Sequence, residues 1–114
     1  MKQMLLIGCA LLLLALPAGA ATVNVSVMDF QFSPKIAMAH IGDVVVWTNV
    51  GAVPHTVTSY RPGPGGVGRL FDATLAPGQS LSWVVPPPHR VATIPYLCRF
   101  HATRGMTGQI AVTP

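Results

Sequence analysis

The stretch that decides the fold class is Thr22-Val23-Asn24-Val25-Ser26-Val27-Met28. Valine occupies every second position, and small polar residues stand between the valines. Alternation with a period of two is typical of a strand that turns one face to a core and the other to solvent. This stretch is therefore predicted to be a β-strand.

Further stretches rich in Val, Thr and aromatic residues follow at short intervals along the chain. The predicted strands are Lys35–His40, Asp43–Asn49, His55–Ser59, Gln79–Val85, Thr93–Cys98 and Thr107–Thr113. Turn-forming Gly and Pro residues separate them, and the irregular stretch 60–70 is expected to form a flexible loop. No segment shows a helical period. The sequence thus predicts an all-β fold, a Greek-key β-sandwich of about seven to eight strands.

Residues 1–20 have the character of a secretory signal peptide. Lys2 precedes an apolar run from Met4 to Leu16, and Ala18-Gly19-Ala20 matches an A-x-A cleavage signal, so we expect cleavage before Ala21. A membrane anchor would need about 20 apolar residues, more than this run contains. Lipidation is the alternative, because Leu6-Ile7-Gly8-Cys9 resembles a lipid-attachment box. However, Cys9 lies inside the apolar run and not at its end.

The expected mature chain, residues 21–114, is long enough for one domain with a modest core. Without Lys2, the formal net charge of +4 becomes +3. The charges are scattered and lack interleaved aromatic residues, which argues against nucleic-acid binding and leaves room for an acidic protein partner. We expect a periplasmic or otherwise exported monomer that does not span a membrane. Its single cysteine, Cys98, is either a buried inert thiol or a ligand.

Three potential metal ligands lie in one short segment near the C-terminus. Cys98, His101 and Met106 follow the spacing C-x2-H-x4-M, and Gly105 and Gly108 are expected to let the loop turn sharply around one ion. His55 is the natural fourth ligand, because it opens a predicted strand that a sandwich can bring beside Cys98. Since 43 residues separate His55 from Cys98, only the folded chain could form the site.

The ligand types indicate which metal would bind. Two imidazoles and a thiolate with a weak methionine ligand suit one copper ion that cycles between Cu(I) and Cu(II). Zinc takes four strong ligands in a structural site or a water in a catalytic one, and methionine serves neither purpose. Each residue alone could be an ordinary polar or core residue, but the exported thiol would then have no role.

With these motifs in view, the chain resembles the cupredoxins, in particular the plastocyanin, pseudoazurin and amicyanin group. The likeness spans nearly the whole mature chain. Besides the C-x2-H-x4-M loop it includes the stretches Asp29–Pro34, Gly42–Asn49, Pro54–Val57 and Leu75–Ser80. The resemblance implies a type-1 blue copper site with His55, Cys98, His101 and Met106 as ligands. It also implies that the Thr56 N–H donates to the Cys98 sulfur.

The resemblance further implies that the edge of His101 is the exit for the electron. Small and apolar residues should frame this edge, namely Gly51, Ala52, Val53, Pro54 and Phe100. Arg99 and Arg104 flank His101 and are either simply solvated or steer an acidic partner.

The expected function is single-electron transfer between redox partners, such as a cytochrome or a membrane or periplasmic oxidoreductase. Four protein ligands leave no open position for a substrate, which argues against an enzyme. His40 and His89 are expected to be ordinary surface or turn residues. Two alternatives stay open. One is a periplasmic copper carrier or buffer without electron transfer, and the other is a metal-free structural β-sandwich.

Overall fold

The computed structural model describes residues 19–87 and 93–113. All but the last two residues of the predicted signal peptide therefore lie outside the described residues. Cys9 and His89 also lie outside them. The described elements are β1 (Thr22–Met28), β2 (Gln31–Ser33), β3 (Ile36–His40), β4 (Val44–Asn49), β5 (His55–Ser59), β6 (Asp72–Leu75), β7 (Ser80–Val84), β8 (Thr93–Leu97), the 3-10 helix η1 (Ala102–Arg104) and β9 (Thr107–Thr113). No helix within these residues is long and apolar enough to cross a bilayer.

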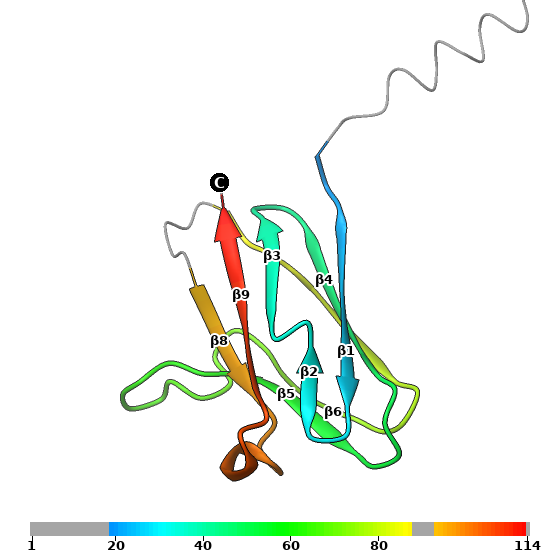
Figure 1. The fold of residues 1–114 in the computed structure, drawn as a ribbon. Coiled ribbons are helices and arrows are strands. Elements are labelled where there is room, and N and C mark those ends of the chain that lie inside the picture. Colours follow the sequence, from blue (N-terminus) through cyan, green and yellow to red (C-terminus); the bar gives the residue numbers. More distant parts are fainter. Residues whose placement is uncertain (1–18, 88–92, 114) are drawn as a thin grey trace, which may run out of the picture.

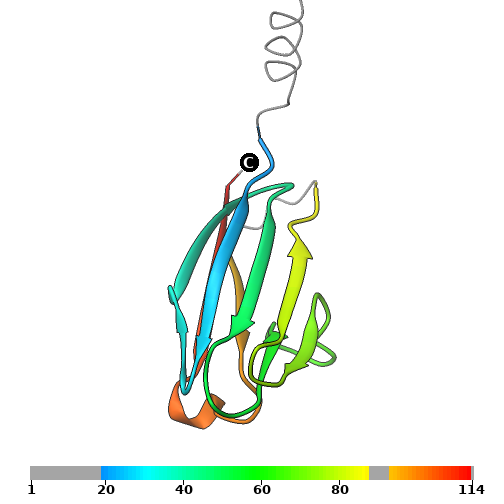
Figure 2. The same ribbon diagram turned by 90° about the vertical axis from the view of Figure 1, so that its right-hand side faces the viewer.

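The strands form two sheets that pack face to face. One sheet has the order β2-β1-β4-β7 and the other β3-β9-β8-β5-β6. Figure 2 shows β1, β4 and β7 side by side in one layer, with β8 and β9 behind them. Two neighbouring pairs, β1 with β4 and β3 with β9, are parallel, so the chain crosses between the sheets. The predicted all-β sandwich is confirmed.

Alternation along β1 places its valines in the core, as the sequence predicts. Val25 and Val27 are buried, and Val25 stands opposite Trp47 in the β1–β4 register. Trp47 packs against Tyr96 from the other sheet, with ring centroids 5.4 Å apart. Phe71 contacts both of these rings, at 4.8 and 6.1 Å. Large aromatic side chains therefore join the two layers, and their burial supplies much of the driving force for folding.

Two strands of the structure were not predicted. β2 has only three residues and β6 only four, too few for a period to be visible in the sequence. Strand β5 was predicted with the right bounds, although all five of its residues are buried and no alternation marks it. Its polar side chains find partners. Thr58, for example, donates to Asp72 on β6.

One end of the sandwich gathers the loops that carry the predicted ligands. Helix η1, the turn between β1 and β2 and the connection from β4 to β5 all lie there (Figure 1). The start of β1 and the end of β9 lie at the opposite end (Figure 1). The candidate site is therefore remote from both ends of the described chain.

Candidate metal centre

The strands bring His55, Cys98 and His101 together from two separate parts of the chain. His55 opens β5, and Cys98 directly follows β8, which pairs with β5. After Cys98 the chain folds back, because the His101 N–H donates to the Cys98 carbonyl at 3.2 Å. Gly105 closes η1 in the left-handed conformation with φ of 82°, which is the sharp turn expected of it.

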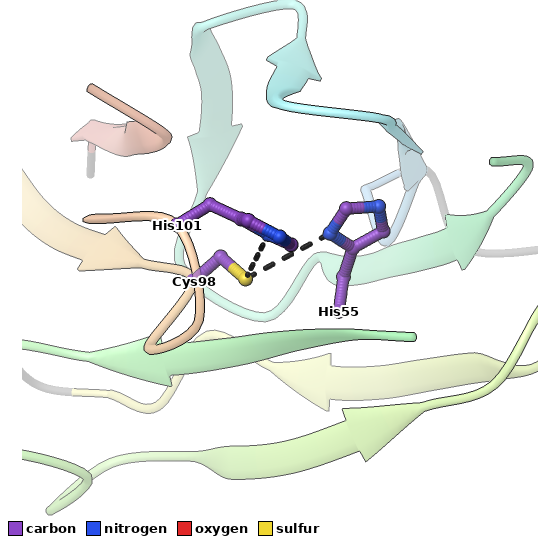
Figure 3. A group of neighbouring side chains, drawn as sticks. All are labelled: His55, Cys98 and His101. Carbon is purple, nitrogen blue, oxygen red and sulfur yellow. Dashed lines mark hydrogen bonds between the residues drawn. The ribbon is translucent and has the colours of Figure 1, made fainter. Parts of the chain in front are cut away.

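The three side chains point their ligand atoms at one another (Figure 3). Cys98 Sγ lies 3.8 Å from His55 Nδ1 and 3.5 Å from His101 Nδ1. All three atoms lie within 4.8 Å of one another. His55 and Cys98 are fully buried, whereas His101 is only half-buried. Cys98 is the one free cysteine of the described chain.

Met106 lies next to this group. Its backbone accepts from the Cys98 N–H at 3.1 Å and donates to the His101 carbonyl at 3.3 Å. Its side chain is fully buried. The loop thus returns to Cys98 after one turn of η1, and Met106 belongs to the buried core.

The sulfur of Cys98 receives the hydrogen bond that the resemblance implied. The backbone N–H of Thr56 donates to Sγ over 3.4 Å, and the Thr56 hydroxyl accepts from the Arg99 N–H at 2.7 Å. Both bonds link β5 to the segment after β8. Together they hold the Cys98 sulfur in place.

The structure adds Asp29, which the sequence reasoning did not identify as part of the site. Asp29 Oδ1 lies 2.8 Å from His55 Nε2, on the side of the ring away from the sulfur. A carboxylate only accepts, so Nε2 carries the proton and Nδ1 presents its lone pair toward Cys98. A backbone hydrogen bond from Ala52 and then the bond from His55 lower the pKa of Asp29.

Gly51 provides the space that Asp29 occupies. A Cβ placed on Gly51 would lie 2.2 Å from Asp29 Oδ1, a contact that real atoms do not make. The Ala52 N–H donates to the same carboxylate at 3.0 Å. Gly51 and Ala52 therefore accommodate and bind the Asp29 carboxylate behind His55. They were expected to frame the edge of His101, but they do not line the hollow there.

Gly108 also differs from its expected role. It lies within β9, outside the left-handed region, and does not turn the chain. It stands opposite Tyr96 in the β8–β9 register, and a Cβ there would lie 2.5 Å from Tyr96 Cζ. Its missing side chain makes room for the buried ring.

The exposed side of His101 opens into a shallow, largely apolar hollow. Val53, Pro54 and Phe100 line it as expected, together with Phe30 and Arg104. Phe30 meets His101 edge to face, with centroids 4.9 Å apart. The sequence analysis did not place Phe30 at this hollow. The stretch Asp29–Pro34, which resembles the family, was the signal that could have indicated it. Its φ of 74° is unusual for a residue with a side chain.

The two arginines beside His101 differ in their surroundings. Arg99 pairs with the carboxylate of Asp72 on β6. The guanidinium of Arg104 lies over the ring of Phe30, 4.9 Å from its centroid. Of the two, only Arg104 lines the hollow, so the two positions can be tested against each other.

The donor set fits copper. One thiol sulfur and two imidazole nitrogens face a common point, and a buried methionine lies beside them. Soft sulfur together with imidazole is the combination that copper favours in electron-transfer sites. The bond from Asp29 orients one imidazole, as the outer partners of metal ligands generally do. His40 lies at the end of β3, outside this group.

Known proteins share both the sequence and the fold of this chain. Amicyanin-alpha of Methylorubrum extorquens is 32% identical over 96 residues, which make up 84% of this chain and 74% of the relative. No protein-family model matches the chain. Among solved structures, a purple cupredoxin from Nitrosopumilus maritimus superposes with a TM-score of 0.64 at 26% identity, over 82% of this chain and 99% of that one.

The amicyanin of Paracoccus versutus superposes with a TM-score of 0.63 over 87% of this chain and 86% of that structure. Its identity of 20% shows a common fold alone.

Proposed function

Since this chain belongs to the cupredoxin family, as its amicyanin relative shows, we propose that it is an exported blue copper protein that carries single electrons between redox partners. Its cofactor is one copper ion. The single observation that carries the proposal is the convergence of Cys98 Sγ, His55 Nδ1 and His101 Nδ1 within 4.8 Å.

The proposed ligands are His55, Cys98, His101 and Met106. When bound, copper supplies one-electron chemistry between Cu(I) and Cu(II). Four protein ligands leave no position for a substrate, so we propose a carrier and not an enzyme. The buried Met106, whose backbone bonds to Cys98 and His101, supports the fourth assignment.

The surrounding residues hold the ligands still. Asp29 fixes the ring of His55, and the Thr56 N–H fixes the sulfur of Cys98. Because the folded chain sets these positions, the side chains need to move little when the charge of the site changes by one. Small movement is what fast electron exchange requires.

His101 is the proposed point of electron entry and exit. It is the most exposed of the three clustered residues and opens into the hollow lined by Phe30, Phe100 and Pro54. An apolar rim of this kind lets a partner protein approach closely and exclude water. The proposed partners are a cytochrome or a membrane or periplasmic oxidoreductase. We propose that this protein docks with them as a monomer.

The proposed organisation has a signal peptide at residues 1–20 and one domain at 21–114. Export would place the protein in the periplasm. The N-terminal residues carry this part of the proposal through their basic start, apolar run and A-x-A signal.

Titration of the mature protein with Cu(II) tests the function. We expect an intense blue band from charge transfer between the Cys98 thiolate and copper, which bleaches on reduction and returns on oxidation. Cys98→Ser should lose the band while the fold remains, and Thr103→Ala in the same loop is the matched control. Colourless binding of Cu(I) alone would favour a copper carrier, and no binding at all would leave only a structural sandwich.

A further inference from the structure

A carboxylate lies buried at the end of the sandwich opposite the metal centre. Asp43 follows the turn between β3 and β4, and its side chain is only 4% exposed. Its Oδ1 accepts from the Ala21 nitrogen at 2.9 Å, and its Oδ2 accepts from the His40 N–H at 2.8 Å. These two hydrogen bonds favour the charged form of the carboxylate, and a positive group beside it would favour that form further.

Among the described residues, Asp43 has no ion pair with a lysine or an arginine. Asp72 pairs with Arg99, and Asp29 contacts the buried His55. Asp43 has only the ring of His40, which is 68% exposed and 3.7 Å away.

The nitrogen that contacts Asp43 belongs to the residue expected to begin the mature chain. In the full chain it is an amide with one hydrogen. Hydrolysis of the Ala20–Ala21 bond adds the hydroxyl of one water to the Ala20 carbonyl carbon and a hydrogen to the Ala21 nitrogen. The new amine then takes a proton from water at neutral pH and becomes an ammonium with three hydrogens.

We propose that removal of the leader creates an ion pair between the α-ammonium of Ala21 and the buried carboxylate of Asp43, which stabilises the mature domain. The proposal rests on the proposed signal peptide and on its cleavage before Ala21. Maturation thereby supplies a positive charge beside Asp43.

The backbone around Ala21 supports this assignment. The Ala21 carbonyl accepts from the Val44 N–H at 2.9 Å, so the residue is already held at the start of the β1–β4 ladder. The Asp43 carbonyl accepts from the Val85 N–H at 2.9 Å, beyond the end of β7. The ion pair would thus connect β1 to the turn and to the β7 edge. Hydrogen bonds from His40 and then Ala21 already lower the pKa of Asp43.

The test begins with the full chain, exported with its own leader and purified from the periplasm. Intact mass should show a protein that begins at Ala21. A second version carries Ser-Gly inserted before Ala21, which restores an amide at Ala21 and moves the ammonium away. We expect the thermal midpoint of the extended protein to be lower by about 4 °C or more at pH 7.

The link to Asp43 is measured by a double-mutant cycle. Asp43→Asn removes the charge and keeps the shape, and the insertion should then cost the Asn variant little or nothing. Asp72→Asn is the control, in which the insertion should cost as much as in the wild type. If Asp43→Asn does not fold, the pH series described next decides the question.

The pH dependence gives an independent reading. Among the described residues, His40 is the other titratable group that faces Asp43. The difference between native and extended proteins should persist at pH 7 and close as the pH rises above about 8, where an ordinary α-amine loses its proton.

Equal midpoints at pH 7 for proteins that begin at Ala21 and at the inserted Ser would overturn the ion pair. A mature mass that starts elsewhere would overturn the assumed cleavage. The blue band of Cu(II), measured on the same samples, reports the proposed copper function separately, because the turn between β3 and β4 lies at the end of the sandwich away from η1 (Figure 1).

Discussion

Asp29 connects His55, a proposed metal ligand, to the segment that precedes it. Its carboxylate accepts from His55 Nε2 at 2.8 Å and from the Ala52 N–H at 3.0 Å. Without it, Nε2 would be a buried donor that has lost its partner, and the ring would be free to adopt another orientation. The position of Nδ1 at the site therefore depends on a side chain that does not face the metal.

Asp29→Ala should weaken copper binding by about 10- to 100-fold, the range typical for loss of an outer partner of a ligand. Asp29→Asn should cost less, because its amide oxygen still accepts from His55. Competition with a chelator of known affinity measures both. Asp72→Asn removes a carboxylate outside the site and is the control. Unchanged affinity in Asp29→Ala would show that His55 needs no such support.

The ionisation of Asp43 should make the free energy of unfolding depend on pH in the acid range. Hydrogen bonds from the backbone N–H of His40 and then of Ala21 lower its folded-state pKa below the ordinary value of 3.8. A lowered pKa contributes stability above the unfolded value, and this contribution is lost as the pH falls below 3.8 toward the folded value. Unfolding by denaturant between pH 6 and pH 2 should therefore show a steeper acid loss in the wild type than in Asp43→Asn. Parallel curves would contradict this.

At the scale of elements, the sequence predicts strands best where their length exceeds four residues. β1, β5 and β9 have the predicted bounds, whereas the short strands β2 and β6 were missed. These two strands are defined by their pairing with β1 and β5, not by a pattern of their own. A partner strand distant in sequence gives a three- or four-residue segment its conformation, and no local pattern records that.

The residues of the site likewise fall into those that the sequence predicts and those that it does not. The clustering of His55, Cys98 and His101 was predictable, because the residue types and the spacing of the loop carry the chemistry. The contribution of Asp29 was not, since it depends on a contact across 26 residues and on the space left by Gly51. The pairing of Arg99 with Asp72 was hidden for the same reason.

Gly108 in β9 gives a prediction about packing between strands. In Gly108→Ala, the new methyl group would collide with Tyr96, which is buried between Phe32 and Trp47 at 4.7 and 5.4 Å. Overpacking of this kind costs about 1–3 kcal/mol, so the thermal midpoint should fall by several degrees. Gln109→Ala, at the exposed neighbouring position, is the control. Equal midpoints for the two variants would mean that Tyr96 can move aside.

At the scale of the whole molecule, the protein combines a modest positive net charge with a mainly apolar hollow beside His101. The expected mature chain carries a net charge of +3 once Lys2 is removed from the total of +4. Arg99 is paired with Asp72, so Arg104 is the arginine that gives the rim of the hollow its charge. An acidic partner would be attracted mainly through this one residue.

Arg104→Gln should slow oxidation of the reduced copper protein by the anion hexacyanoferrate(III), roughly two- to fivefold at low ionic strength. The wild-type rate should fall as salt is added, since exposed charges are screened over about 10 Å at 0.1 M. Stopped-flow absorbance of the blue band measures both rates. Arg99→Gln is the matched control, with a smaller expected effect. A rate independent of salt and of Arg104 would exclude electrostatic steering.

The separation of the metal centre from the beginning of β1 and the end of β9 has a practical consequence. A linker to a surface, an electrode or a neighbouring domain can leave the sandwich at the end away from η1 (Figure 1). In an immobilised molecule, the proposed electron-transfer edge of His101 would then face outward, and the linker would not cover it. Fusion to another domain at the start of β1 or at the end of β9 would likewise leave the proposed docking face free.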